Sequence, residues 1–102
     1  MKQSKSENST QSKPKIEFVI ESYPDDPTKK LYAGVKINKL RYGEGIHFYR
    51  DGGKSYKGQW GKNKRHGHGT QYYPYSGHIL HEGQWQNDIR EGYGQVYHSN
   101  GK

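Results

Sequence analysis

Residues 56–60 read Tyr-Lys-Gly-Gln-Trp, and residues 67–69 read Gly-His-Gly. In the first stretch, aromatic residues and glycine alternate with polar residues, a period of two that places Tyr56, Gly58 and Trp60 on one face of a strand. The polar residues between the two stretches suit a turn, and the second stretch leads into an aromatic run that returns as a second strand. This part of the chain therefore predicts a β-hairpin.

The aromatic side chains of this hairpin are expected to lie next to its glycines. With a turn over residues 61–66, Gly58 is expected opposite Gly69 and Trp60 opposite Gly67. Each indole would then lie flat over bare glycine backbone. Such cover matters because glycine weakens a strand unless a neighbouring side chain packs on it.

The same arrangement occurs three times, in residues 31–52, 56–77 and 81–101. The repeated positions are Tyr32, Gly34, Gly43 and Gly45 in the first unit, Tyr56, Gly58, Trp60, Gly67 and Gly69 in the second, and Gly83, Trp85, Gly92 and Gly94 in the third. An isolated hairpin is marginally stable in water, so the units are expected to stack into one sheet of about six strands. The predicted fold is all-β, an elongated twisted antiparallel sheet of consecutive hairpins.

The residues before the repeats differ in composition. Residues 1–15 are mostly Ser, Lys, Gln and Asn without an aromatic residue, which predicts a disordered basic and polar tail. Residues 16–30 are expected to form a short strand and a Pro-rich linker, a possible cap for the repeats. In that strand Ile16, Phe18 and Ile20 alternate with other residues, and we expect these three on its buried face.

The pattern Tyr-x-Gly-x-Trp, a polar turn, Gly-x-Gly and a closing glycine resembles the MORN repeat. Residues 56–77 fit this pattern best, whereas the third unit has His81 in place of Tyr and the first has Lys36 in place of Trp. MORN repeats occur in ciliary and cytoskeletal proteins, in membrane-junction proteins, beside lipid kinases and before a methyltransferase domain. The resemblance implies a three-repeat protein of the small ciliary or cytoskeletal type.

Composition and spacing argue against several classes of function. The chain has no cysteine, and its longest apolar run is three residues, so disulfides, a secretory leader and a membrane span are not expected. His66 and His68 share a face but lack a third protein ligand, so no metal is expected. No nucleophile elbow, paired carboxylates or phosphate loop is evident, which predicts a non-enzymatic cytoplasmic protein without a cofactor.

The formal net charge of +7 gives the strongest indication of a partner. Stacked hairpins place equivalent turns in a row, so a basic ridge is expected from Lys36, Lys39, Arg41, Lys62, Lys64 and Arg65. The alternative is that these basic residues bind no partner and only keep the protein soluble.

We expect a protein-binding scaffold whose partners in a larger assembly, such as an axoneme or other cytoskeletal structure, offer acidic or edge-pairing surfaces. The alternative is peripheral binding of the basic ridge to anionic phospholipid membranes. Nucleic acid is disfavoured, because the aromatic residues keep the spacing that packing requires.

Overall fold

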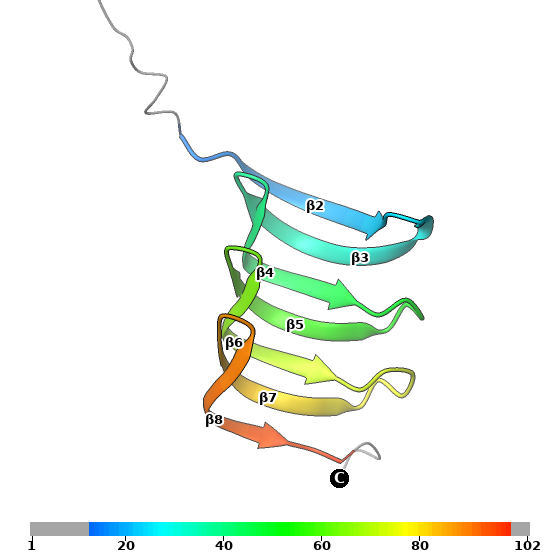
Figure 1. The fold of residues 1–102 in the computed structure, drawn as a ribbon, viewed down its shortest axis with the longest axis vertical. Coiled ribbons are helices and arrows are strands. Elements are labelled where there is room, and N and C mark those ends of the chain that lie inside the picture. Colours follow the sequence, from blue (N-terminus) through cyan, green and yellow to red (C-terminus); the bar gives the residue numbers. More distant parts are fainter. Residues whose placement is uncertain (1–12, 99–102) are drawn as a thin grey trace, which may run out of the picture.

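The computed structural model describes residues 13–98, which form one open antiparallel sheet of seven strands (Figure 1). The strands lie side by side in chain order, so each one pairs with the next along the sequence. They are β2 (Ile16–Tyr23), β3 (Asp26–Ile37), β4 (Leu40–Phe48), β5 (Lys54–Gly61), β6 (Lys64–Tyr72), β7 (Ile79–Gln86) and β8 (Ile89–Val96). The all-β class and the stacked hairpins are confirmed, whereas the predicted tail lies mostly outside the described residues, as does Gly101.

Three tight hairpins, β3–β4, β5–β6 and β7–β8, correspond to the three units. Their turns are 38–39, 62–63 and 87–88, and both residues of each turn have positive φ, such as 49° at Lys62 and 72° at Asn63. Two left-handed residues in succession are typical of the two-residue turns that match the twist of paired strands. The predicted turn over residues 61–66 was therefore too long, because β5 and β6 continue almost to the tip.

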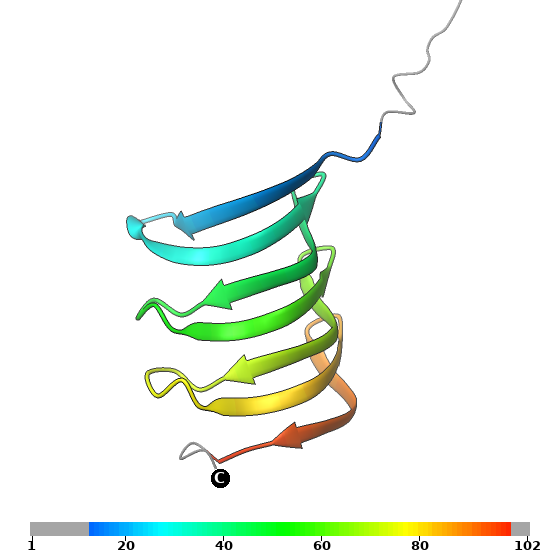
Figure 2. The same cartoon turned by 180° about the vertical axis from the view of Figure 1, so that it is seen from behind.

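The expected pairing of the glycines is confirmed, but that of the indoles is wrong. Gly58 lies opposite Gly69, whereas Trp60 pairs with Arg65 inside its own hairpin and with Gly43 of the preceding one. The register shifts between Gly58 and Trp60, and Gly67 sits in the displaced part of β6 with a φ of +94°. A bulge of this kind bends its strand, and Figure 2 shows the hairpins curling toward their turns.

The strand expected at the start of residues 16–30 is present as β2, but the linker is not. Only Pro24 and Asp25 separate β2 from β3, which begins at Asp26. The pairing of β2 with the first residues of β3 is irregular, and Pro27 lies in this stretch. Proline is tolerated where a ladder is interrupted, which explains why it did not stop the strand.

The face of β2 that packs on the sheet is the opposite of the expected one. Ile16, Phe18 and Ile20 are 66%, 73% and 65% exposed, whereas Val19 packs against the aromatic core. Glu21 shares the inner face with Val19, and its carboxylate pairs with Lys36 of β3. The inner face of β2 therefore carries the carboxylate that a cation on β3 needs.

Candidate functional site

One face of the sheet carries a continuous row of rings, which we call the aromatic face. Ring centroids are 5.5 Å apart for Tyr32 and Trp60, 5.2 Å for Trp60 and Tyr56, 5.5 Å for Tyr56 and Trp85, and 5.4 Å for Trp85 and His81. Interplanar angles of 85° to 89° make every contact edge-to-face, a geometry that aromatic quadrupoles favour. The row spans all three units and forms the core of the protein.

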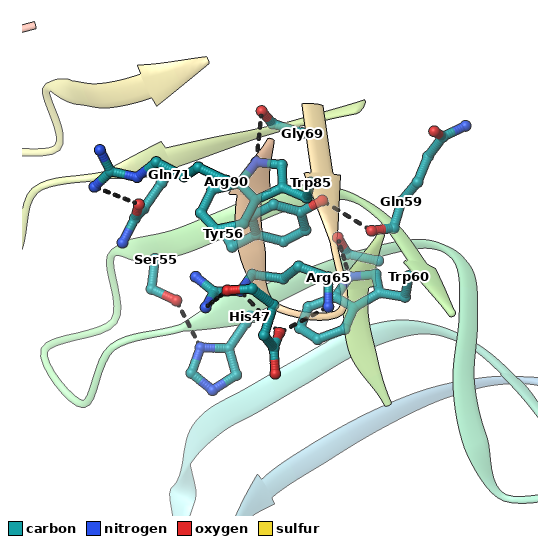
Figure 3. A network of polar contacts seen from close by, with 12 residues as sticks. His47, Ser55, Tyr56, Gln59, Trp60, Arg65, Gly69, Gln71, Trp85 and Arg90 are labelled. Atoms are coloured by element: carbon teal, nitrogen blue, oxygen red, sulfur yellow. Dashed lines mark hydrogen bonds and ion pairs between the residues drawn. The ribbon is translucent and has the colours of Figure 1, made fainter. Parts of the chain in front are cut away.

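In the first two units, the rings that cover glycine backbone are tyrosines, not the indoles that the sequence suggested. A Cβ placed on Gly69 would lie 2.0 Å from Oη of Tyr56, and one on Gly45 would lie 2.3 Å from Oη of Tyr32. Each hydroxyl donates a hydrogen bond of 2.8 Å to a backbone carbonyl three residues on, that of Gln59 for Tyr56 (Figure 3). Burial raises the pKa of Tyr56 to about 12, so this hydroxyl stays protonated and donates.

The indole nitrogens anchor each unit to the one before it. Nε1 of Trp60 donates to the carbonyl of Gly45 at 3.1 Å, and Nε1 of Trp85 donates to that of Gly69 at 3.3 Å. Trp60 therefore lies between the rings of Tyr32 and Tyr56, Trp85 lies between those of Tyr56 and His81, and each bonds to a glycine of the preceding hairpin. A buried indole N–H needs such a partner, which accounts for the paired recurrence of tryptophan and glycine.

Two arginines lie over the rings in equivalent places. The Arg41 guanidinium carbon is 4.5 Å from the Tyr32 ring centroid and 5.3 Å from that of Trp60. The corresponding carbon of Arg65 is 4.3 Å from the Trp85 centroid and 5.9 Å from that of Tyr56. Cation–π attraction of this kind fixes where the charge is held.

Each of these arginines also has an acidic neighbour. Arg65 Nε donates to Oδ1 of Asp88 at 3.0 Å, and the backbone N–H of Arg65 donates to the same oxygen at 2.8 Å. A guanidinium nitrogen of Arg41 lies 3.7 Å from Oε1 of Glu21. Burial alone would raise the pKa of Asp88, but the hydrogen bonds from Arg65 and the charges of Arg65 and Lys64 together lower it.

A hollow of about 360 Å³ opens between the two arginines on the aromatic face. Its lining residues come from β4, β5, β6 and the segments that follow β4, β5 and β7, and they include Arg41, His47, Ser55, Trp60, Arg65 and Asp88. Nδ1 of His47 is 2.6 Å from Oγ of Ser55 (Figure 3). Burial lowers the pKa of His47, and the charges of Arg41 and Arg65 lower it further.

A family model for the MORN repeat matches residues 56–74 and residues 81–102. The chain is a MORN-repeat protein. No curated protein matches it. The first unit lies outside both matches, yet it repeats the pairing of the MORN units, with Gly34 opposite Gly45 and Lys36 in the place that Trp60 occupies in the second unit. MORN repeats generally serve in protein or membrane binding and are typically non-enzymatic.

The six residues of the predicted basic ridge lie in separate places on the sheet. Lys36, Arg41 and Arg65 are partly buried on the aromatic face, where each has an acidic partner. Lys39 and Lys62 are exposed at the hairpin turns, and Lys64 is exposed next to Arg65 in β6. Because successive strand residues point to opposite faces, Lys64 lies on the face away from the hollow.

Sequence reasoning missed the acidic residues that accompany these cations. Glu21 lies two residues beyond Val19 on the inner face of β2, and Asp88 is the second residue of the last turn. Asn63 occupies the equivalent turn position in the second unit and accepts the backbone N–H of Arg41 at 2.8 Å. The recurrence of Asn or Asp at the second turn position, in Asn63 and Asp88, was the sequence signal that could have identified Asp88.

Within residues 13–98, no cluster of three or more His, Cys, Asp or Glu side chains is arranged to hold a metal ion. In the same part of the chain, no helix is long and apolar enough to cross a membrane. His66 and His68, the pair considered for a metal, lie on β6 on either side of Gly67.

His81 stands where the other units have tyrosine, and its buried Nδ1 has no hydrogen-bond partner within the described residues. His81→Tyr is expected to stabilise the protein by about 1 kcal/mol, because the new hydroxyl could donate to the carbonyl of Gln84, as Tyr56 does to that of Gln59. Urea denaturation followed by tryptophan fluorescence would measure this gain. The exposed His66→Tyr is the matched control and should change little.

The same substitution should reduce the pH dependence of stability. Burial, aided by the charge of Arg90, lowers the pKa of His81 in the folded protein, whereas an unfolded histidine titrates near 6.5. The unfolded chain therefore takes up this proton first, and stability is lost as the pH falls below about 6.5. An unchanged loss of stability in His81→Tyr would contradict this assignment, although His47 retains a contribution of the same sign.

Proposed function

We propose that this MORN-repeat protein is a non-enzymatic adaptor that binds an acidic, extended segment of a partner protein in the hollow of its aromatic face. Such an adaptor would serve inside a larger assembly. MORN repeats occur in ciliary and cytoskeletal proteins, so we propose an axoneme or another cytoskeletal structure as that assembly. The observation that carries the proposal is the pair of arginines, Arg41 and Arg65, held over rings on either side of the hollow.

The electrostatics around the hollow support an acidic ligand. Two cations, Arg41 and Arg65, line the hollow against one carboxylate, that of Asp88. Because the guanidinium groups already rest on rings, binding would order few further side-chain torsions. A guanidinium also offers several N–H donors in a fixed plane, which suits the carboxylates of Asp and Glu.

A labelled oligoglutamate peptide tests this site directly. Arg41→Gln combined with Arg65→Gln should weaken peptide binding by about tenfold or more, since each charged hydrogen bond is worth about 1.5 kcal/mol. Lys39→Gln combined with Lys62→Gln removes the same charge from the exposed turns and is the matched control. Fluorescence anisotropy at physiological salt would measure both affinities.

The two pairs of variants separate a defined site from general attraction. Equal weakening by both pairs would show that net charge alone draws the peptide, and an absence of binding by the unchanged protein would rule out the acidic ligand. Circular dichroism of each variant would verify that the sheet is intact. Only selective loss in the arginine pair supports the hollow as the site.

The adaptor role has its own test in the cell. After detergent extraction of the source cells at physiological salt, an assembly component should remain in the insoluble cytoskeletal pellet. Full release into the supernatant would argue against stable incorporation. The arginine variants should be released more readily than the lysine variants if the aromatic face makes the attachment.

Peripheral binding to anionic membrane is a second candidate, favoured by the exposed turn lysines. The turns that carry Lys39 and Lys62 lie one above the other on the same side of the sheet (Figure 1). Each lysine near an anionic bilayer contributes about 1 kcal/mol. Co-sedimentation with phosphatidylserine vesicles should then be lost in the lysine pair and retained in the arginine pair.

A further inference from the structure

Among residues 13–98, strand β2 ends the sheet with an open edge and an uncovered apolar row. Ile16, Phe18 and Ile20 are each about two-thirds exposed or more, and their side chains lie on the face away from the aromatic core. Val35 and Ile37 of β3 are their neighbours on that face, opposite Phe18 and Ile16. An exposed edge strand with apolar residues is a template for pairing with another chain.

Within the described part of the chain, the backbone N–H and C=O groups left without a strand partner at this edge belong to Ile16, Phe18 and Ile20. The N–H of Asn38 donates to the carbonyl of Lys15 at 2.9 Å, which places Lys15 among the residues bonded to β3. In an antiparallel ladder, bonded residues alternate with residues whose backbone groups point the other way. The N–H and C=O groups of Ile16, Phe18 and Ile20 therefore face outward from the sheet.

We propose that β2 pairs antiparallel with β2 of a second copy of this chain, around a two-fold axis at Phe18. Phe18 then lies opposite Phe18 of the second copy, and Ile16 opposite Ile20, so the two apolar rows form one continuous patch. The pairing joins both sheets into a single larger one. It uses the face and edge that the aromatic hollow leaves free.

Charge selects this register over its neighbours. Centring the axis on Phe18 places Lys15 opposite Glu21 of the second copy and Glu17 opposite Val19. Moving the axis to Glu17 would oppose two glutamates, and moving it to Val19 would oppose Glu17 and Glu21. Since like charges directly across a strand pair are destabilising, the Phe18 register is favoured over both of these neighbours.

Other occupants fit this edge less well. Residues 1–12 contain Met1 as their only apolar side chain, so they offer little to cover the row. Pairing of β2 with β8 of another copy would leave an open edge at each end and grow into a filament. The two-fold arrangement instead closes on itself as a dimer, with one interface made of two identical strands.

Single cysteines test the register, because the chain has none of its own. Cα atoms of a bonded antiparallel pair are about 5.5 Å apart, within the range that a disulfide spans. Phe18→Cys should therefore form a disulfide-linked dimer on mild oxidation. Ile16→Cys or Ile20→Cys alone should link poorly, whereas a mixture of the two should link to each other.

A matched pair of variants tests which edge is used. In sedimentation velocity over a dilution series, the unchanged protein should approach twice its chain mass of 11.8 kDa. Ile20→Lys should abolish this association, whereas Ile89→Lys makes the same change at a similarly exposed position of β8, 68% against 65%, and should not. Peptide binding on the aromatic face should be unaffected by either.

Three results would overturn the dimer. The unchanged protein could remain a monomer at every concentration, Ile89→Lys could abolish association in place of Ile20→Lys, or Phe18→Cys could link no faster than Ile16→Cys. The last result would refute the register even if association persisted. Failure of peptide binding would leave all three measurements unaffected, so the dimer and the adaptor role are tested separately.

Discussion

Gly69→Ala is expected to lower the free energy of unfolding by about 2 to 3 kcal/mol, at the upper end of what overpacking costs. The added Cβ would meet Oη of Tyr56 at 2.0 Å and Cζ at 2.3 Å. Tyr56 is fully buried between two indoles and cannot move aside without breaking its edge-to-face contacts. Urea denaturation followed by tryptophan fluorescence would measure the loss.

Gly61→Ala is the matched control for this change. Gly61 also lies in a strand, but a Cβ placed there meets only ordinary contacts, the nearest at 3.4 Å from Cβ of His66. Alanine costs less backbone entropy than glycine, so this variant should be unchanged or slightly more stable. Equal destabilisation of both variants would mean that glycine at position 69 does not serve to admit the Tyr56 ring.

The spacing of glycine and aromatic residues was enough to predict the hairpins and the pairing of Gly58 with Gly69. It was not enough to assign which ring covers the glycines. The bulge at Gly67 displaces Trp60 toward the preceding hairpin, and a register shift leaves no clear mark in residue periodicity. The tyrosine of the same strand is left above the glycine pair.

The orientation of β2 shows a second limit of pattern reasoning. Alternation of apolar residues normally identifies the buried face, which here would place Ile16, Phe18 and Ile20 inside. The tight turn of the next hairpin brings Lys36 directly opposite Arg41, and two like charges there need a carboxylate. Glu21 supplies it, so electrostatic pairing across three strands overrides the local hydrophobic pattern.

The basic ridge illustrates why a row of equivalent residues need not form one surface. Equivalent turns do stack, as predicted, but successive residues of a strand point to opposite faces. Arg65 consequently lies over the rings while Lys64 faces away. The sequence identified the cations, and only the register of the hairpins decides which of them adjoin the hollow.

Tyr56→Ala should be the most damaging single substitution, with a loss of about 3 to 5 kcal/mol. It removes a ring in contact with Trp60, Trp85 and Arg65, together with a hydroxyl bonded to the backbone of Gln59. It also uncovers the facing glycines. For a domain of this size, such a loss approaches the whole stability, and unfolding at a low urea concentration is expected.

Two comparisons show where that energy comes from. Tyr93→Ala removes the same side chain from β8, where it is 96% exposed, and should change stability by less than about 0.5 kcal/mol. Tyr56→Phe removes only the hydroxyl and should cost about 1 kcal/mol. A similar loss for Tyr56→Ala and Tyr93→Ala would contradict the view that the aromatic row is the core.

The combination of Tyr56→Ala with Gly69→Ala links the two large effects. The three atoms nearest to the added Cβ all belong to Tyr56, so the clash disappears when the ring is gone. Gly69→Ala should then cost little in the Tyr56→Ala background, and the double variant should be about 2 kcal/mol more stable than the sum of the single losses predicts. Additive losses would indicate that ring and glycine act independently; a strong coupling would explain why tyrosine and glycine recur together in the first two units.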